Sequence, residues 1–262
     1  MRTSISDDQR LAAREPPPDE QPVMRQRWED LLFLHWKIPV PELESRLPPG
    51  LHLDTFEGSA YLGIVPFLMR KVYPVPLFPV PWISDFLELN VRTYVLGPDG
   101  IPGVWFFSLD ANQPIAVEVA RRWYSLNYRH AAMTSIVTEE SARDYRCRRL
   151  GEREQARFTY PLPHSQTTAL AEPGTLEFFL LERYLLYAWS PQKVQLFRGR
   201  VAHEPYRFSQ IHAETISAAP ARWEGFDASV SAPPCHQAVA QAVNVRAYPL
   251  QAISSEPRPG KP

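Results

Sequence analysis

The sequence predicts a single domain of the α+β class that is mostly antiparallel β-sheet, with a few short flanking helices. Short apolar runs recur along the chain, and turn residues such as Gly, Pro and Asp separate many of them. There is no internal repeat and no convincing linker. A chain of 262 residues is long enough to bury one large core.

The predicted domain covers residues 23–253 and lies between two polar tails. Residues 1–22 are charged and proline-containing and include no apolar run, so we expect a disordered tail there. Residues 254–262 are polar as well, and we expect a second disordered tail.

In the first part of the domain, the apolar run Met24–Ile38 indicates strand rather than helix. Residues 39–50 predict one short helix, because prolines suit its start and a Pro-Pro-Gly sequence ends it. The apolar runs 51–56 and 59–69 are joined through Glu57-Gly58, and this arrangement predicts a β-hairpin.

Residues 74–82 contain four prolines and predict an extended loop or edge, because proline cannot donate to a ladder of hydrogen bonds. Strands are expected over 85–95 and 103–110, with a Gly-Pro-Asp-Gly turn between them. Asn112 and Pro114 then indicate the start of a helix.

The C-terminal half continues the same alternation. Residues 130–162 predict two or three strands, and Thr175 is placed to cap a short helix that follows it. Residues 193–206 predict a further strand, 217–240 an irregular segment and 244–253 the last strand.

The most informative pattern lies in the strand expected over 85–95. Glu88, Asn90 and Arg92 alternate there with apolar side chains. Successive side chains of a strand point to opposite faces, so these three polar groups are expected to line one face. That face is either the wall of a polar pocket or an ordinary solvated surface.

Further polar groups are candidates for the same site. Ser108 and Asp110 share one face of the next strand and are possible partners of Arg92, which must either face water or find a carboxylate. Arg121 and Arg122 follow the predicted helix, and one of them can enter a cavity as an anion clamp. A structural ion-pair network and a ligand site remain equally open interpretations.

Charge and composition exclude several classes of partner. The net charge is −1, so no global field favours nucleic acid or an acidic membrane. No run is long enough to span a bilayer, and no secretory h-region is present. Only Cys147 and Cys235 occur, which suits a reducing cytoplasm, and we expect a cytoplasmic protein.

The chain also lacks the usual motifs of metal and cofactor sites. No two of its seven histidines have the spacing of a local metal-ligand pair, and His35 is expected to be a hydrogen-bonded core residue. There is no G-x-S-x-G elbow, P-loop or G-x-G-x-x-G sequence. We therefore expect neither a metal nor a cofactor, and the sequence does not indicate an oligomeric state.

Several long strings, including RWEDLLFLHWKIP, ELNVRTYV and VWFFSLDA, resemble the bacterial YqjF-like family, a domain of unknown function. The strings LERYLLY and RGRVAHEPY add to the resemblance, which covers about residues 23–250. That family is similar in fold to acetoacetate decarboxylase. The resemblance implies an antiparallel β-barrel or double sheet with flanking helices and an internal cavity.

Acetoacetate decarboxylase uses a Schiff-base lysine beside a second lysine, and the resemblance implies where this chain differs. Tyr128 occupies the nucleophile's place, Arg129 that of its neighbour, and Glu88 falls near an active-site glutamate. No lysine lies between Lys71 and Lys193. The resemblance therefore carries over the fold and not the Schiff-base mechanism.

The function predicted on this basis is binding of a small organic molecule, with a carboxylate as a candidate group, in an internal polar pocket. Arg92 or Arg121 would hold the anion, Tyr128 would donate a hydrogen bond and Glu88 would act as an acid or base. The alternatives are a decarboxylase or lyase that uses other residues, and a non-enzymatic structural or interaction domain.

Overall fold

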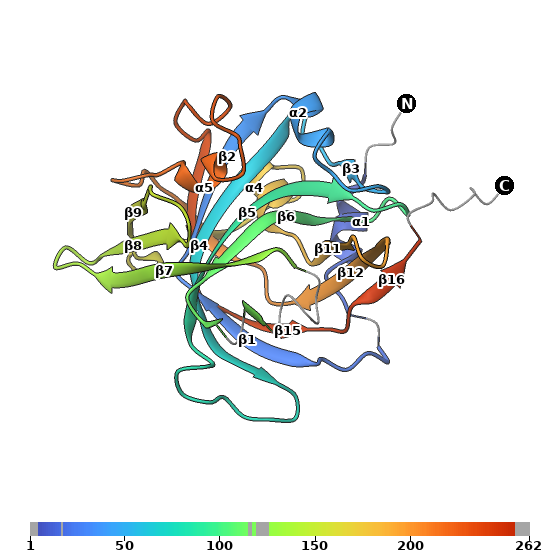
Figure 1. Cartoon of the computed structure of the whole chain (residues 1–262), viewed down its shortest axis with the longest axis horizontal. Helices are drawn as coiled ribbons and strands as arrows, with labels where there is room; N and C mark the ends of the chain where they lie inside the picture. The colour runs from blue at the N-terminus through green and yellow to red at the C-terminus, as the bar shows by residue number, and fades with distance from the viewer. Residues whose placement is uncertain (1–4, 17, 115–116, 119–125, 255–262) are drawn as a thin grey trace.

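The computed structural model describes residues 5–16, 18–114, 117–118 and 126–254. Its centre is a closed ring of strands in the order β1-β4-β5-β6-β11-β12-β15 and back to β1 (Figure 1). The ring strands are β1 (Met24–Glu29), β4 (Ala60–Pro74), β5 (Phe86–Leu96), β6 (Pro102–Ala111), β11 (Leu185–Ser190), β12 (Gln195–Ala202) and β15 (Val243–Ala247). All of these pairings are antiparallel except that between β6 and β11, so the predicted barrel of mostly antiparallel strands is confirmed.

Two groups of strands extend the ring. One continues from β4 and consists of β2 (Leu31–Ile38), β14 (His236–Ala240), β13 (Arg207–Gln210) and β10 (Ala169–Leu170). The other continues from β6 and consists of β7 (Tyr128–Val137), β8 (Ala142–Arg149) and β9 (Ala156–Pro161). Two short strands, β3 (His52–Leu53) and β16 (Gln251–Ile253), pair with β5 and β12.

The described helices are short. They are α1 (Asp7–Ala12), α2 (Val40–Glu44), α4 (Leu176–Leu181), α5 (Ala219–Arg222) and a single 3₁₀ turn η1 (Pro163–Ser165). The helix predicted within 39–50 is α2, with proline in its first turn. Thr175 caps α4 as predicted, because its hydroxyl accepts a hydrogen bond from the Phe178 N–H.

The two faces of the ring strands belong to different cores. Leu87, Leu89 and Val91 of β5 pack on the outer face, where β8, β9, α2 and α5 cover them. The opposite face packs into a second cluster with residues from β1, β4, β6 and β15, for example Val65 and Val245. Because strands on opposite sides of the ring share this second cluster, it is the interior of the barrel.

The N-terminal tail differs from the prediction. Residues 5–16 are described and include α1, which begins with a capping box between Ser6 and Gln9. Arg10 of this helix is buried and binds both carboxylate oxygens of Asp54 at 2.5 and 2.9 Å. Composition does not reveal this tertiary ion pair, which joins the segment to the barrel.

Three other predicted elements also differ from the structure. The strand predicted over 24–38 is broken at Asp30, whose φ is 50°. The predicted turn at Glu57-Gly58 forms, with an antiparallel bridge between Phe56 and Ser59, but β3 and β4 do not pair across it, because β3 pairs with β5. The segment 217–240, predicted to be irregular, contains α5 and ends in β14.

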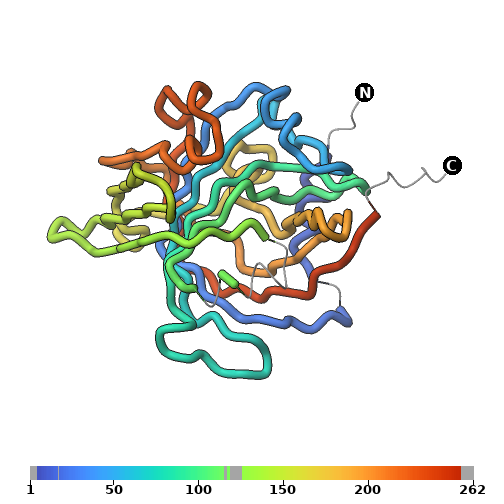
Figure 2. The backbone as a smooth tube through the Cα atoms, in the orientation of Figure 1, coloured from blue at the N-terminus to red at the C-terminus, as the bar shows by residue number. Residues whose placement is uncertain are grey.

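The proline-rich segment is a loop, as predicted. After β4 ends at Pro74, the chain extends away from the barrel and returns to β5 at Phe86 (Figure 2). Phe78 and Trp82 in this loop are 82% and 88% exposed. In the described part of the chain, no helix is long and apolar enough to cross a bilayer.

Candidate functional site

The polar line of β5 faces the barrel interior. Glu88 pairs with Phe67 and Ala111 of the neighbouring strands, and paired residues of antiparallel strands share a face. Phe67 and Ala111 both belong to the interior cluster. Asn90 and Arg92 follow at intervals of two residues and therefore line the same wall.

At one end of this line, Glu88 is bound by Tyr128. The Tyr128 hydroxyl donates a hydrogen bond of 2.6 Å to Glu88 Oε2. Burial raises the pKa of the Glu88 carboxyl to about 7, although hydrogen bonds from Tyr128 and Asn90 oppose the rise. Glu88 is thus close to equally protonated and ionised near neutral pH, as a general acid or base requires.

The other end of the line carries a guanidinium without a carboxylate partner. Arg92 is half-buried, and none of the ion pairs among the described residues includes it. Its Nη2 makes only long contacts of 3.4 Å to the Tyr94 hydroxyl and 3.3 Å to the Leu180 carbonyl. Arg92 Nε and Asn90 Oδ1 are both buried and have no partner within the described structure.

A chain of hydrogen bonds braces this end. Tyr94 donates to the Leu180 carbonyl at 2.9 Å, so its oxygen accepts from His35 Nε2 at 2.7 Å. His35 Nδ1 is then an acceptor, and His236 Nδ1 donates a hydrogen bond to it at 2.9 Å. His35 is a hydrogen-bonded core residue, as predicted. The sequence carries no local signal for His236, because β14 brings it from 201 residues away.

Ser108 and Asp110 do not join the polar line. They pair in register with Val91 and Leu89, which places them on the outer face. There Arg149 binds Asp110 at 2.7 and 2.8 Å and donates to the Ser108 hydroxyl at 2.6 Å. The expectation that these two residues serve Arg92 is wrong, because the pleat of the sheet separates them from it.

The remaining candidates lie elsewhere. Arg129 neighbours Tyr128 on β7 but is exposed. Arg121 and most of the helix predicted from Asn112 fall outside the described residues. Three of the four lysines, Lys37, Lys71 and Lys193, are described, and all are exposed. In the described ranges, no group of three metal-ligating side chains lies together.

The barrel interior thus combines three chemical capacities on one wall. Arg92 can hold an anion, Asn90 can accept a hydrogen bond, and Glu88 can exchange a proton. Arg92 follows Glu88 by four positions on β5, which corresponds to about 13 Å along the strand. A small molecule bound at Arg92 therefore lies beside Asn90.

Solved structures that are similar in fold to this chain include an acetoacetate decarboxylase and an enduracididine biosynthesis enzyme. Acetoacetate decarboxylase from Legionella pneumophila superposes with a TM-score of 0.61 and 10% identity, over 92% of each chain. The enduracididine biosynthesis enzyme MppR complexed with pyruvate superposes with a TM-score of 0.60 and 12% identity, over 90% of this chain and 92% of that one. At such identities the likeness establishes the fold alone.

Sequence comparisons give the family. The uncharacterized protein YqjF of Bacillus subtilis (strain 168) is 36% identical over 197 residues, which cover 75% of this chain and 79% of that protein. The sequence profile of DUF2071, described as an uncharacterized conserved protein, matches residues 25–248. The YqjF-like resemblance is thereby confirmed. The chain belongs to the DUF2071 family.

Proposed function

We propose that the barrel interior binds a small organic acid whose carboxylate is held by Arg92. The observation that carries this proposal is the Arg92 guanidinium, which lies inside the barrel with a buried Nε that has no partner in the described structure. Its neighbours are aromatic rings and a carbonyl, for example the Phe33 ring at 5.3 Å. A guanidinium in such surroundings favours a carboxylate as a bidentate partner.

Asn90 would complete the site, because its Oδ1 would accept a hydrogen bond from the ligand. Glu88 lies about 13 Å along the strand from Arg92, so it would exchange a proton only with a ligand long enough to span that distance. The complex of a structural neighbour with pyruvate, a small carboxylate, supports the class of ligand. Since the described lysines are exposed, the proposal involves no Schiff base.

Calorimetric titration with pyruvate and acetoacetate tests this proposal, with methyl pyruvate as an uncharged analogue. We expect the acids to bind and the ester to bind poorly. Arg92→Gln should weaken binding by about tenfold or more, because a hydrogen bond between charged groups is lost. Arg148→Gln changes an exposed arginine and is the matched control.

Arg92 also contacts Tyr94 and Leu180, so the fold of the variant is checked by its circular dichroism and melting temperature. Equal affinity of the folded Arg92→Gln variant and the control for the acids would refute the assignment. Absence of binding to every acid tested would favour a non-enzymatic domain whose polar residues only brace the barrel.

A second function, an enzyme of the decarboxylase or lyase type, is favoured by one observation. The pKa of Glu88 is about 7 and its carboxyl is held by Tyr128, so the interior contains a group suited to proton transfer. Turnover of a bound acid that falls in Glu88→Gln while affinity is retained would support it. Binding of an acid without turnover would refute the enzyme and support the binding function.

A further inference from the structure

A groove of about 790 Å³ has a lining that does not include Glu88, Asn90 or Arg92. Its walls come from the segment after α1, the β1–β15 ladder, the end of β4 and the turn between β12 and β13. The charged residues that line it are Arg14, Arg25, Arg27, Lys71, Arg207 and Arg246, with Glu15 and Glu204. Six basic and two acidic residues thus line the groove, and one of the six, Arg27, is paired with Glu29 at 2.6 Å, in a chain with 28 basic and 29 acidic residues.

Two of these arginines are direct cross-strand neighbours. Arg25 of β1 is paired in register with Arg246 of β15, and both are exposed. Like charges directly opposite each other destabilise a sheet. An anion bound between the two guanidinium groups would attract both of them and offset their mutual repulsion.

Arg14 is held at the groove by a defined set of contacts. Arg200 Nη1 donates to the carbonyls of Ala13 and Glu15, the latter at 3.0 Å, and so fixes the backbone on both sides of Arg14. The Arg14 guanidinium lies 5.7 Å from the centre of the Tyr184 ring. The guanidinium also interacts with the Tyr184 hydroxyl and with the Glu182 carboxyl, and these contacts hold it at the edge of the groove.

His203 contributes a neutral ring to the wall, packed against the rings of Tyr184 and Tyr206. Its Nδ1 donates to the Glu204 carbonyl at 2.7 Å, which leaves Nε2 with a lone pair. Nε2 is buried and has no partner in the described structure. Burial lowers the pKa of His203 to about 4, so the ring is neutral at physiological pH.

From this charge distribution we propose that the groove is a second ligand site, which binds a small molecule carrying two or more phosphate groups. Guanidinium groups bind phosphate oxygens in bidentate fashion, and several arginines at one groove match several phosphates. The volume is within the range of ligand pockets, about 300–1,000 Å³. The groove shares no lining residue with Glu88, Asn90 and Arg92, so this site does not depend on the function proposed for the barrel interior.

Inorganic pyrophosphate and ADP are the probes that test this proposal, by calorimetric titration of the full chain at low salt. We expect both to bind, with inorganic phosphate weaker. The double variant Arg25→Gln/Arg246→Gln should lose about tenfold or more in affinity for pyrophosphate, because two charged hydrogen-bond donors are removed. Its melting temperature without ligand should equal or exceed that of the wild type, since the like-charge pair is gone.

The matched control is Arg148→Gln/Arg153→Gln, which changes the net charge equally at exposed positions on and beside β8. It should retain wild-type affinity. Equal loss in both double variants would show unspecific charge attraction and refute the site, as would no heat of binding with millimolar pyrophosphate.

Anionic lipid headgroups carry the same phosphate chemistry, so vesicles of phosphatidylglycerol form a separate arm of the experiment. We expect weak sedimentation with the vesicles, and pyrophosphate should release any protein that does bind. Tight vesicle binding that pyrophosphate does not reverse would overturn the assignment to a small soluble ligand.

Discussion

Tyr128 and Glu88 are joined by a 2.6 Å hydrogen bond, although 40 residues separate them in the chain. Glu88 lies on β5 and Tyr128 on β7, and β6 runs between these strands. The contact therefore ties the β7–β8–β9 extension to the interior of the barrel. The Tyr128 hydroxyl thereby donates a hydrogen bond to the Glu88 carboxyl, whose pKa is about 7.

Replacing Glu88 with glutamine should change how the free energy of unfolding depends on pH. The folded protein holds the Glu88 proton up to about pH 7, whereas the ordinary pKa is 4.5. Between these values the folded state binds more protons than the unfolded state, so this group's contribution to stability falls as pH rises and is constant above pH 7. The free energy of unfolding of Glu88→Gln should rise by about 3 kcal/mol relative to that of the wild type as the pH increases from 4.5 to 8.

Urea denaturation of both proteins across this pH range measures the difference. His35, His203 and His236 have lowered pKa values and make the folded protein less stable as pH falls below 6.5. These groups are common to both proteins, and their effects cancel in the difference. Parallel stability curves would contradict the raised pKa of Glu88.

Truncating Arg149 should destabilise the fold strongly. Asp110 is fully buried, and Arg149 binds both of its oxygens. Arg149→Met leaves this carboxylate buried without its partner, at a cost of about 3–5 kcal/mol in the free energy of unfolding. Arg146→Gln, which removes a far more exposed partner of Asp144, should cost less than about 1 kcal/mol. Similar losses in the two variants would count against a buried network.

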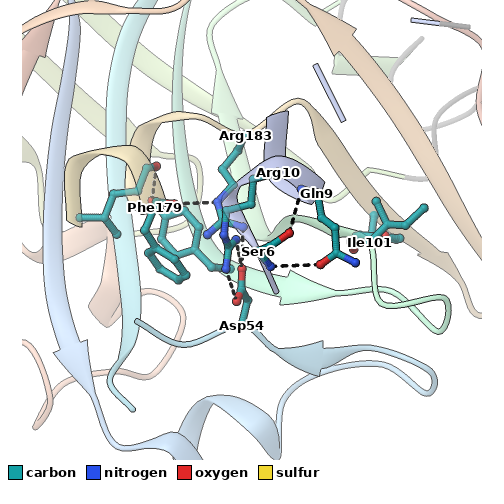
Figure 3. Close-up of polar contacts among 10 residues, drawn as sticks. Ser6, Gln9, Arg10, Asp54, Ile101, Phe179 and Arg183 are labelled. Atoms are coloured by element: carbon teal, nitrogen blue, oxygen red, sulfur yellow. Dashed lines mark hydrogen bonds and ion pairs between the residues drawn. The ribbon is translucent and has the colours of Figure 1, made fainter. Parts of the chain in front are cut away.

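Arg10 should anchor the N-terminal segment. Figure 3 shows Arg10 and Arg183 converging on Asp54, with Phe179 beside them. In Arg10→Met the carboxylate keeps Arg183 at 2.7 Å, so we expect a loss of about 1–3 kcal/mol together with faster proteolysis before residue 16. Asp8→Asn on the exposed side of α1 should cost below about 1 kcal/mol. Unchanged proteolysis in Arg10→Met would show that other contacts hold the segment.

Schiff-base chemistry should be absent. Incubation with acetoacetate and borohydride is expected to give no covalent adduct by mass spectrometry, because the described lysines are exposed and none lies in the barrel interior. Lys71→Ala and Lys193→Ala identify the residue if an adduct does form. An adduct lost in either variant would restore a lysine-dependent decarboxylase.

Local rules were sufficient for much of the fold. Proline and glycine positions placed α2 and the loop before β5, and Thr175 marked the start of α4, because these effects act within a few residues. The alternation of Glu88, Asn90 and Arg92 with apolar residues was enough to place the three on one face. The spacing of two residues in a strand fixes that result without tertiary information.

Only the tertiary structure decided which face is inside and which residues meet. Ser108 and Asp110 were separated from Arg92 by the register between β5 and β6, and register depends on contacts across the sheet. Arg10 became buried only because Asp54 and Arg183 meet it from distant segments. The sequence by itself determined the strands, the short helices and the polar line. Closure of the ring decided that this line is the wall of an interior, because burial and pairing depend on residues far apart in the chain.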